Sequence, residues 1–150
     1  MKLYTTYFYQ IRNMPRTIIC LSTVYSPPKY EVKDSTGQSA IIIRCNPLIP
    51  GEACEGLCEG KCNPKHPKDC AFLKAYRKQL DKIDFNDFID KLLDLRARLL
   101  KDFPDQEDFD FAFIFYEKYD NPCSERWPVQ DWLRLHGIEV EEWKKSGKSY

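Results

Sequence analysis

The sequence predicts a single α/β domain over residues 1–150, with a small Rossmann-like, mostly parallel sheet, flanking helices and a cysteine-rich metal-binding loop at 54–70. The main observation is that residues 109–117, 125–136 and 138–143 read as strand, helix and strand. A helical crossover of this kind joins parallel strands. A chain of 150 residues can also bury a core without cross-links.

Strands are predicted near both ends of the chain. Residues 3–9 are rich in Thr, Tyr and Phe, and residues 17–24 are β-branched and apolar on both faces, as in a buried strand. Residues 109–116 are aromatic or aliphatic almost throughout. A short apolar run at 40–44 can be a strand or simple packing. The alternation at 138–143 predicts a last strand at an edge of the sheet.

Helices are predicted between these strands. Residues 70–83 carry apolar side chains at helical spacing, and a longer apolar stripe follows at 85–103. Asp84 between them is a candidate N-cap, so the two stretches are two helices or one helix bent at Asp84. A third helix, at about 125–136, should end at Gly137, the residue type typical of the C′ position. A polar tail follows at 144–150 and should be flexible.

The most concentrated chemistry is in the cysteine-rich loop. Cys54, Cys58, Cys62, His66 and Cys70 follow one another at intervals of four residues, among glycines and prolines that exclude a continuous helix. Thiolate and imidazole ligands in a tightly turning loop are typical of a structural metal site. We predict zinc bound by Cys54, Cys58, Cys62 and Cys70, with His66 as the alternative ligand. An iron–sulfur cluster on the same thiolates and a set of unrelated buried thiols stay open.

Composition argues against membrane proteins and against a broad nucleic-acid surface. Lys and Arg together number 23, as do Asp and Glu, so any anion site must be local. The N-terminus lacks an apolar secretory core, and no run approaches the roughly 20 apolar residues that span a bilayer. We therefore expect a cytoplasmic protein without a membrane partner. In that compartment the seven cysteines, an odd number, should be free or metal-bound and not paired.

The predicted functional site is the turn at 117–126, between a strand and a helix. Open α/β sheets bind ligands at the carboxyl ends of strands, beside helix N-termini whose unpaired N–H groups favour an anion. A cation in the first turn of a helix opposes the helix dipole, and a bound anion or a carboxylate such as Glu117 would explain it. The alternative is a surface salt bridge. The predicted ligand-binding residues are Arg126, Ser124, which can instead be an N-cap, Tyr7, Arg12 and Asn13.

Catalysis at this turn would use Cys123 or Glu117. A thiolate at a helix N-terminus beside Arg126 would be stabilised and could act as a nucleophile. Cys123 can equally pack under the turn. No histidine lies near it in the sequence to serve as its base, because the chain has only His66 and His136.

Motifs at the two ends of the chain occur in the order and spacing of a known family. They are the opening strand, Arg12-Asn13-Met14-Pro15, the buried strand from Thr17 to Ser22, Tyr116-Glu117-Lys118, the cysteine-centred turn and Trp132-Leu133-x3-Gly137-Ile138-Glu139-Val140. Covering about half the chain, they resemble the domain-of-unknown-function 488 family of bacteria and phages. That family's turn usually reads Cys-His-Arg-His. Here Cys123-Ser124-Glu125-Arg126-Trp127 keeps the Cys and the Arg but lacks both histidines. The resemblance therefore implies no histidine-dependent chemistry, and the family has no settled reaction.

We expect a protein that binds a nucleotide or a nucleic-acid phosphate at the 117–126 turn and carries a structural metal. Catalysis on a phosphate or glycosidic bond is left open. The alternative is a non-enzymatic phage or host-defence accessory factor that captures a ligand or inhibits a protein partner. Such a factor needs Arg126 and a pocket but no nucleophile.

Overall fold

The computed structural model describes residues 1–57 and 65–145 of the chain. Its strands and α-helices are β1 (Leu3–Tyr7), β2 (Ile18–Ser22), β3 (Ile42–Arg44), α1 (Ala71–Asp81), α2 (Phe85–Asp102), β4 (Asp110–Phe115), α3 (Arg126–Leu135) and β5 (Val140–Glu142). Short 3₁₀ helices are η1 (Phe8–Asn13), η2 (Asn46–Leu48), η3 (Glu52–Cys54) and η4 (Pro67–Asp69). The predicted strands and helices are present, and the 40–44 run contributes a strand.

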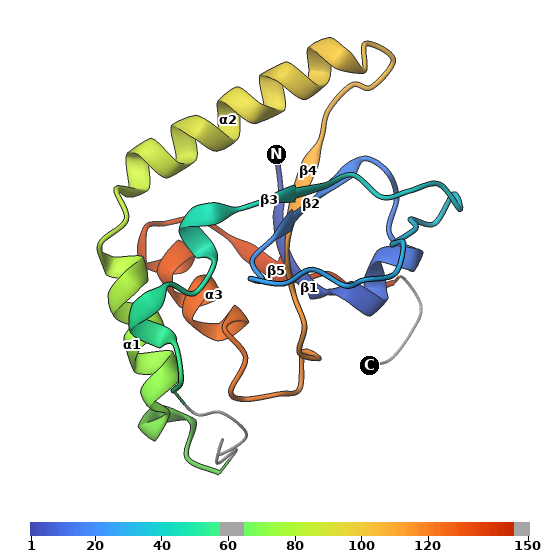
Figure 1. Ribbon diagram of the computed structural model, residues 1–150. Coiled ribbons are helices and arrows are strands. Elements are labelled where there is room, and N and C mark those ends of the chain that lie inside the picture. The colour runs from blue at the N-terminus through green and yellow to red at the C-terminus, as the bar shows by residue number, and fades with distance from the viewer. Residues whose placement is uncertain (58–64, 146–150) are drawn as a thin grey trace.

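The strands form one five-stranded sheet in the order β3-β2-β4-β1-β5 (Figure 1). Every neighbouring pair is parallel, which confirms the α/β fold and its parallel sheet. The central strand is β4, and its residues from Phe111 to Phe115 are at most 1% exposed. This burial explains why the 109–116 run is apolar on both faces. As predicted, β5 lies at an edge.

The two faces of the sheet are covered differently. On one face α1, α2 and α3 pack against Phe111, Phe113 and Phe115 of β4. On the other face the chain between β1 and β2 contributes Phe8, Ile11 and Met14, which pack against Ala112 and Ile114. Figure 1 shows η1 in blue on the side of the sheet away from α1 and α3. The β1–β2 connection therefore crosses β4 on one face, while the helical connections run over the other.

Local signals place the helix ends where the sequence predicts them. Asp84 caps α2, because its carboxylate accepts a hydrogen bond from the Asp87 N–H at 3.1 Å, so 70–103 forms two helices. Gly137 follows α3 with φ near +80°, a left-handed conformation that glycine adopts without strain. The Ile138 N–H then bonds the Leu133 carbonyl at 2.9 Å and closes the helix end. Within the described ranges, no helix is long and apolar enough to cross a membrane.

Candidate functional site

A pocket of about 480 Å³ lies at the carboxyl ends of β2 and β4. These strands are neighbours in the sheet, and the chain leaves them in opposite directions, from β2 toward β3 and from β4 toward β5. Open α/β sheets bind ligands at such a switch in direction. We call this cavity the switch pocket. Its lining is Thr23, Val24, Tyr25, Ser26, Pro50, Gly51, Cys54, Glu55, Gly56, Leu57, Phe72, Tyr116, Glu117 and Glu125.

One wall of the switch pocket is fixed by a side chain of α1. The amide nitrogen of Gln79 donates to the carbonyl oxygen of Ile49 at 2.7 Å, and its amide oxygen accepts from the Gly51 N–H at 2.8 Å. A single amide therefore clamps the segment between η2 and η3. Since this segment has little secondary structure of its own, the clamp keeps the wall in one conformation.

The opposite wall is fixed by contacts between the ends of β2 and β4. The Thr23 hydroxyl donates to the Ile114 carbonyl oxygen at 2.8 Å, which holds the residue after β2 against β4. Farther out, the Tyr116 hydroxyl donates to the carbonyl oxygen of Ser26. Both sides of the pocket are thus held by hydrogen bonds within the chain, as is usual for small-molecule sites.

Two carboxyl groups, Glu117 and Glu125, meet in the switch pocket. Burial raises the pKa of Glu125 to about 8, and the charge of Glu117 and a hydrogen bond with it add to the shift. The Ser124 hydroxyl donates a hydrogen bond to Glu117 Oε2 at 3.3 Å. The raised pKa favours the protonated form of Glu125. A carboxyl pair that shares one proton provides an acid and a base at the same place.

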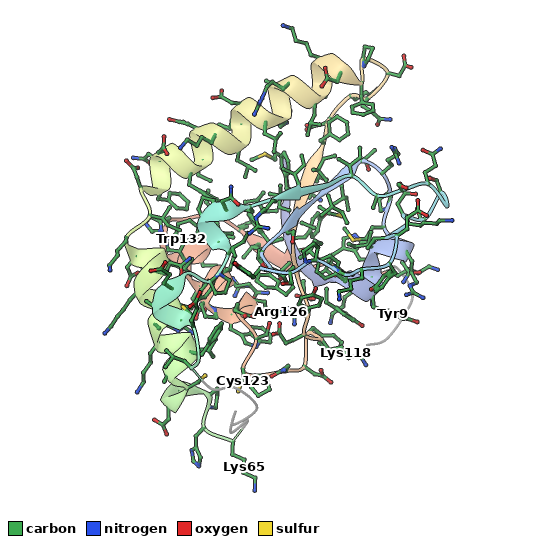
Figure 2. The ribbon with its side chains drawn as sticks, viewed as in Figure 1. Tyr9, Lys65, Lys118, Cys123, Arg126 and Trp132 are labelled. Carbon is green, nitrogen blue, oxygen red and sulfur yellow. The ribbon has the colours of Figure 1, made fainter. Side chains whose placement is uncertain are left out.

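Arg126, the strongest candidate ligand in the sequence, is fully buried. Its Nε lies 2.9 Å from Glu142 Oε1, and its guanidinium carbon lies 5.7 Å from the centre of the Phe115 ring. Figure 2 shows Arg126 inside the molecule, with Cys123 on the turn outside it. Arg126 also does not line the switch pocket. Its predicted contact with a ligand is therefore wrong, and its charge is matched by a carboxylate at the opposite edge of the sheet.

The Arg126–Glu142 pair belongs to a buried polar network under α3. Thr5 donates its hydroxyl to Glu142 Oε1 at 2.8 Å, and the Gln130 amide donates to the Thr5 oxygen at 2.7 Å. Burial lowers the pKa of Arg126 and raises that of Glu142, so for each ion the loss of water outweighs the partner's attraction. Among the described residues, none accepts a hydrogen bond from Nη1 or Nη2 of Arg126. The pair orients the start of α3 at an energetic cost.

Ser124 and Cys123 are both occupied in the structure. The Ser124 oxygen accepts from the Arg126 N–H at 3.2 Å, so it acts as a cap at the start of α3, one of the two predicted roles. Cys123 is disulfide-bonded, so the expectation that the cysteines are free or metal-bound is wrong for this residue. A disulfide has no thiolate, and the predicted nucleophile is therefore not available in this form. Of the two predicted catalytic residues, Glu117 alone lines the pocket.

The predicted ligand residues after β1 do not join the switch pocket. Tyr7 is buried, and its hydroxyl accepts from the Gln10 amide at 3.4 Å. Arg12 stacks over the Tyr9 ring at 4.0 Å, and Asn13 donates to Gln10 at 3.1 Å, both within η1. None of the three predicted residues lines the pocket. Tyr7 ends β1 beside Phe115 of β4, but η1 then turns onto the opposite face of the sheet, so a role of these residues in ligand binding stays a prediction.

The predicted metal site lies only partly within the described residues. Cys58 and Cys62 lie outside them, whereas Cys54 and Cys70 are described and buried. Within 1–57 and 65–145, no group of three or more His, Cys, Asp or Glu side chains is arranged to hold a metal ion. The Cys54 thiol is free, and burial raises its pKa. Zinc or an iron–sulfur cluster on the four cysteines stays a prediction.

A second cavity, of about 650 Å³, lies on the other side of the 117–127 turn. It is formed by the N-terminal part of α1, the residues before α1, and the turn. We call it the basic groove. Its lining is Pro67, Lys68, Leu73, Lys74, Arg77, Tyr119, Asp120, Pro122 and Trp127. Among the described residues, the groove lining has three cations and one carboxylate, whereas the lining of the switch pocket has three acidic side chains and no cation.

Comparison with known proteins adds no family. No family model, no curated protein and no solved structure matches the chain. The resemblance to the domain-of-unknown-function 488 family stays a prediction, and the function has to be argued from the residues.

Two residues of the site were not singled out from the sequence. The sequence shows Glu125 only as part of the turn, because its importance depends on its contact with Glu117 and on its burial. Glu142 was predicted as part of an edge strand. Strand alternation does contain a signal for it, because Val140 and Glu142 must point to the same face, and Val140 is apolar. A carboxylate on the core side of a strand requires a buried cation.

Proposed function

We propose that the protein binds a nucleoside-type ligand, a planar base joined to a hydroxylated sugar, in the switch pocket. The observation that carries the proposal is the meeting of two carboxyl groups, Glu117 and Glu125, in a pocket at the carboxyl ends of β2 and β4. The pocket volume of about 480 Å³ exceeds that of one nucleoside and lies in the range of small-molecule sites.

The lining divides into parts that suit the two halves of such a ligand. Val24, Tyr25, Leu57 and Phe72 offer apolar and aromatic surface for a base. Carboxylates at the ends of parallel strands accept hydrogen bonds from ribose hydroxyls in dinucleotide-binding folds, and Glu117 occupies such a position. The charged side chains among the described lining residues are all acidic, and they disfavour a phosphate. The pocket therefore suits an uncharged part of a nucleotide better than its phosphate.

The same carboxyl pair supports cleavage of the glycosidic bond. In the proposed step the C1′–N bond breaks, its electron pair goes to the base nitrogen, and the proton of Glu125 goes to the same nitrogen. Glu117 stabilises the positive charge that develops on the sugar. Water then adds to C1′ and returns a proton to Glu125. A general acid needs its proton at the working pH, and the raised pKa of Glu125 meets this need.

The test is calorimetric titration of the protein with the common ribonucleosides and deoxyribonucleosides, followed by chromatography of the mixtures for free base. We expect at least one nucleoside to bind, and Glu117→Gln to weaken it by about 1.5–3 kcal/mol, the range for a hydrogen bond to a charged group. Glu125→Gln should bind the nucleoside with little change, because an amide mimics the protonated acid, but should release base at least about 100-fold more slowly.

The matched control is Glu52→Gln, which removes one exposed carboxylate near the pocket without changing its lining. It should behave as the unchanged protein does. Two results would overturn the proposal: no nucleoside binds, or every nucleoside that binds is indifferent to Glu117→Gln. Binding that depends on Glu117 without release of base would restrict the proposal to ligand recognition.

A further inference from the structure

We infer that the basic groove binds the sugar–phosphate backbone of single-stranded nucleic acid, so that the nucleoside in the switch pocket belongs to a strand. This inference rests on the proposed function and names its substrate class. The sequence predicts a phosphate-binding site near Arg126, and this inference places the phosphate in the basic groove instead.

The charge of the basic groove supports an anionic ligand. Lys68 and Lys74 are exposed, and no ion pair of the described residues includes either of them. Arg77 is 2.9 Å from Asp131, an exposed pair that salt weakens readily. Since the chain as a whole has no net charge, this local excess of cations is the kind of site that the composition permits.

Aromatic side chains in the groove favour nucleic acid over a simple anion. Trp127 is half-buried, and its indole N–H donates to the Asn121 carbonyl oxygen at 2.7 Å, which fixes the ring. Tyr119 lines the same groove, and the Lys144 ammonium lies 5.0 Å from the centre of its ring. Single-strand binding proteins combine this pair of features, cations along the backbone and aromatic rings on which bases stack.

The two cavities are lined by neighbouring residues of α1 and of the turn. Phe72 lines the switch pocket and Leu73, the next residue of α1, lines the basic groove. On the other side, Glu125 lines the pocket and Trp127 lines the groove. A base in the pocket thus brings the adjoining phosphate toward the cations.

The experiment measures fluorescence anisotropy of a short, labelled, single-stranded oligonucleotide of mixed sequence, as DNA and as RNA, titrated with the full chain. We expect it to bind more tightly than the best nucleoside. The double change Lys68→Glu and Lys74→Glu should weaken this binding about tenfold or more, while leaving nucleoside binding within about twofold. The matched control is Lys78→Glu with Lys82→Glu, which makes the same change of charge at exposed positions outside the groove.

The outcomes separate this inference from the proposed function. If nucleosides bind through Glu117 but oligonucleotides bind no more tightly, or if both double variants weaken them equally, the groove inference fails and the proposed function stands. If oligonucleotide binding depends on Lys68 and Lys74 while no nucleoside binds, the inference about the groove stands and the proposed function fails. If inorganic polyphosphate displaces the oligonucleotide at equal phosphate concentration, the groove is a general polyanion surface, and the inference of a strand is overturned.

Discussion

The switch pocket and the basic groove lie on either side of one turn, yet they are built in different ways. The pocket is formed by the ends of sheet strands and by loops that are hydrogen-bonded to them, and the charged side chains of its described lining are all acidic. The groove is formed by the N-terminal part of α1 and the turn itself, and its polar groups are mainly basic. A protein with no net charge can therefore present two opposite local fields within a few residues.

The turn at residues 117–127 separates two cavities of opposite charge. Residues 117–127 place the Glu117–Glu125 carboxyl pair on one side and a tryptophan beside cations on the other. Arg126 lies between Glu125 and Trp127 in the sequence and is anchored by Glu142. The buried ion pair thus fixes the boundary between the two cavities, and neither cavity uses it directly.

The largest expected effect follows from breaking this anchor. Glu142→Gln leaves the Arg126 charge buried without a carboxylate, and we expect the free energy of unfolding to fall by about 3–5 kcal/mol. Because the anchor supports both sides of the turn, nucleoside and oligonucleotide binding should weaken together. Urea denaturation at pH 7 measures the stability, and calorimetry measures the binding.

Two further variants test this first prediction. Glu141→Gln removes the neighbouring, exposed carboxylate of β5 and should change stability by less than about 0.5 kcal/mol. Replacing both members of the pair, Arg126→Met with Glu142→Leu, should recover most of the stability, since an apolar pair of similar volume costs little in place of a buried ion pair. If Glu142→Gln is as stable as Glu141→Gln, the turn is not anchored by this pair.

An intermediate effect is expected in the acidic cavity alone. The Glu125 carboxyl has a pKa of about 8 in the fold, against an ordinary value of 4.5, so the folded chain binds this proton more tightly than the unfolded chain. The stabilisation is fully present below pH 4.5 and is lost as the pH rises to about 8. The full shift corresponds to about 5 kcal/mol, and because Glu125 is only half-buried and water screens its charge, we expect a loss of about 1–3 kcal/mol. Glu125→Gln should remove this decline. Thermal unfolding between pH 5 and 9, with Glu139→Gln as the exposed control, measures it.

Much of the fold could be predicted because its signals are local. The aromatic run that became β4, the cap at Asp84 and the glycine after α3 each depend on a few adjacent residues. The strand order β3-β2-β4-β1-β5 could not be predicted in this way. It depends on the β1–β2 connection crossing β4 on the face without helices, and η1 lacks the length and the amphipathic repeat that identify a crossover helix.

The structure has a pocket beside the predicted turn, but it buries Arg126 away from that pocket. The location followed from a general property of parallel sheets, which needs only the order of strand, turn and helix. Whether Arg126 faces a ligand or the core depends on Glu142, sixteen residues later, and on the parallel pairing of β1 with β5 that brings it near. The disulfide at Cys123 likewise depends on which cysteines meet in space.

The smallest expected effect distinguishes the two cavities by salt. If a strand places about two phosphates on the groove, raising the salt from 50 mM to 200 mM should weaken oligonucleotide binding about sevenfold, because each phosphate contact releases counterions. Nucleoside binding involves no phosphate and should change by less than about twofold over the same range. Calorimetry at several salt concentrations measures both slopes. Equal slopes for the two ligands would mean that the groove adds no phosphate contact, and that the contrast of charge between the cavities has no consequence for binding.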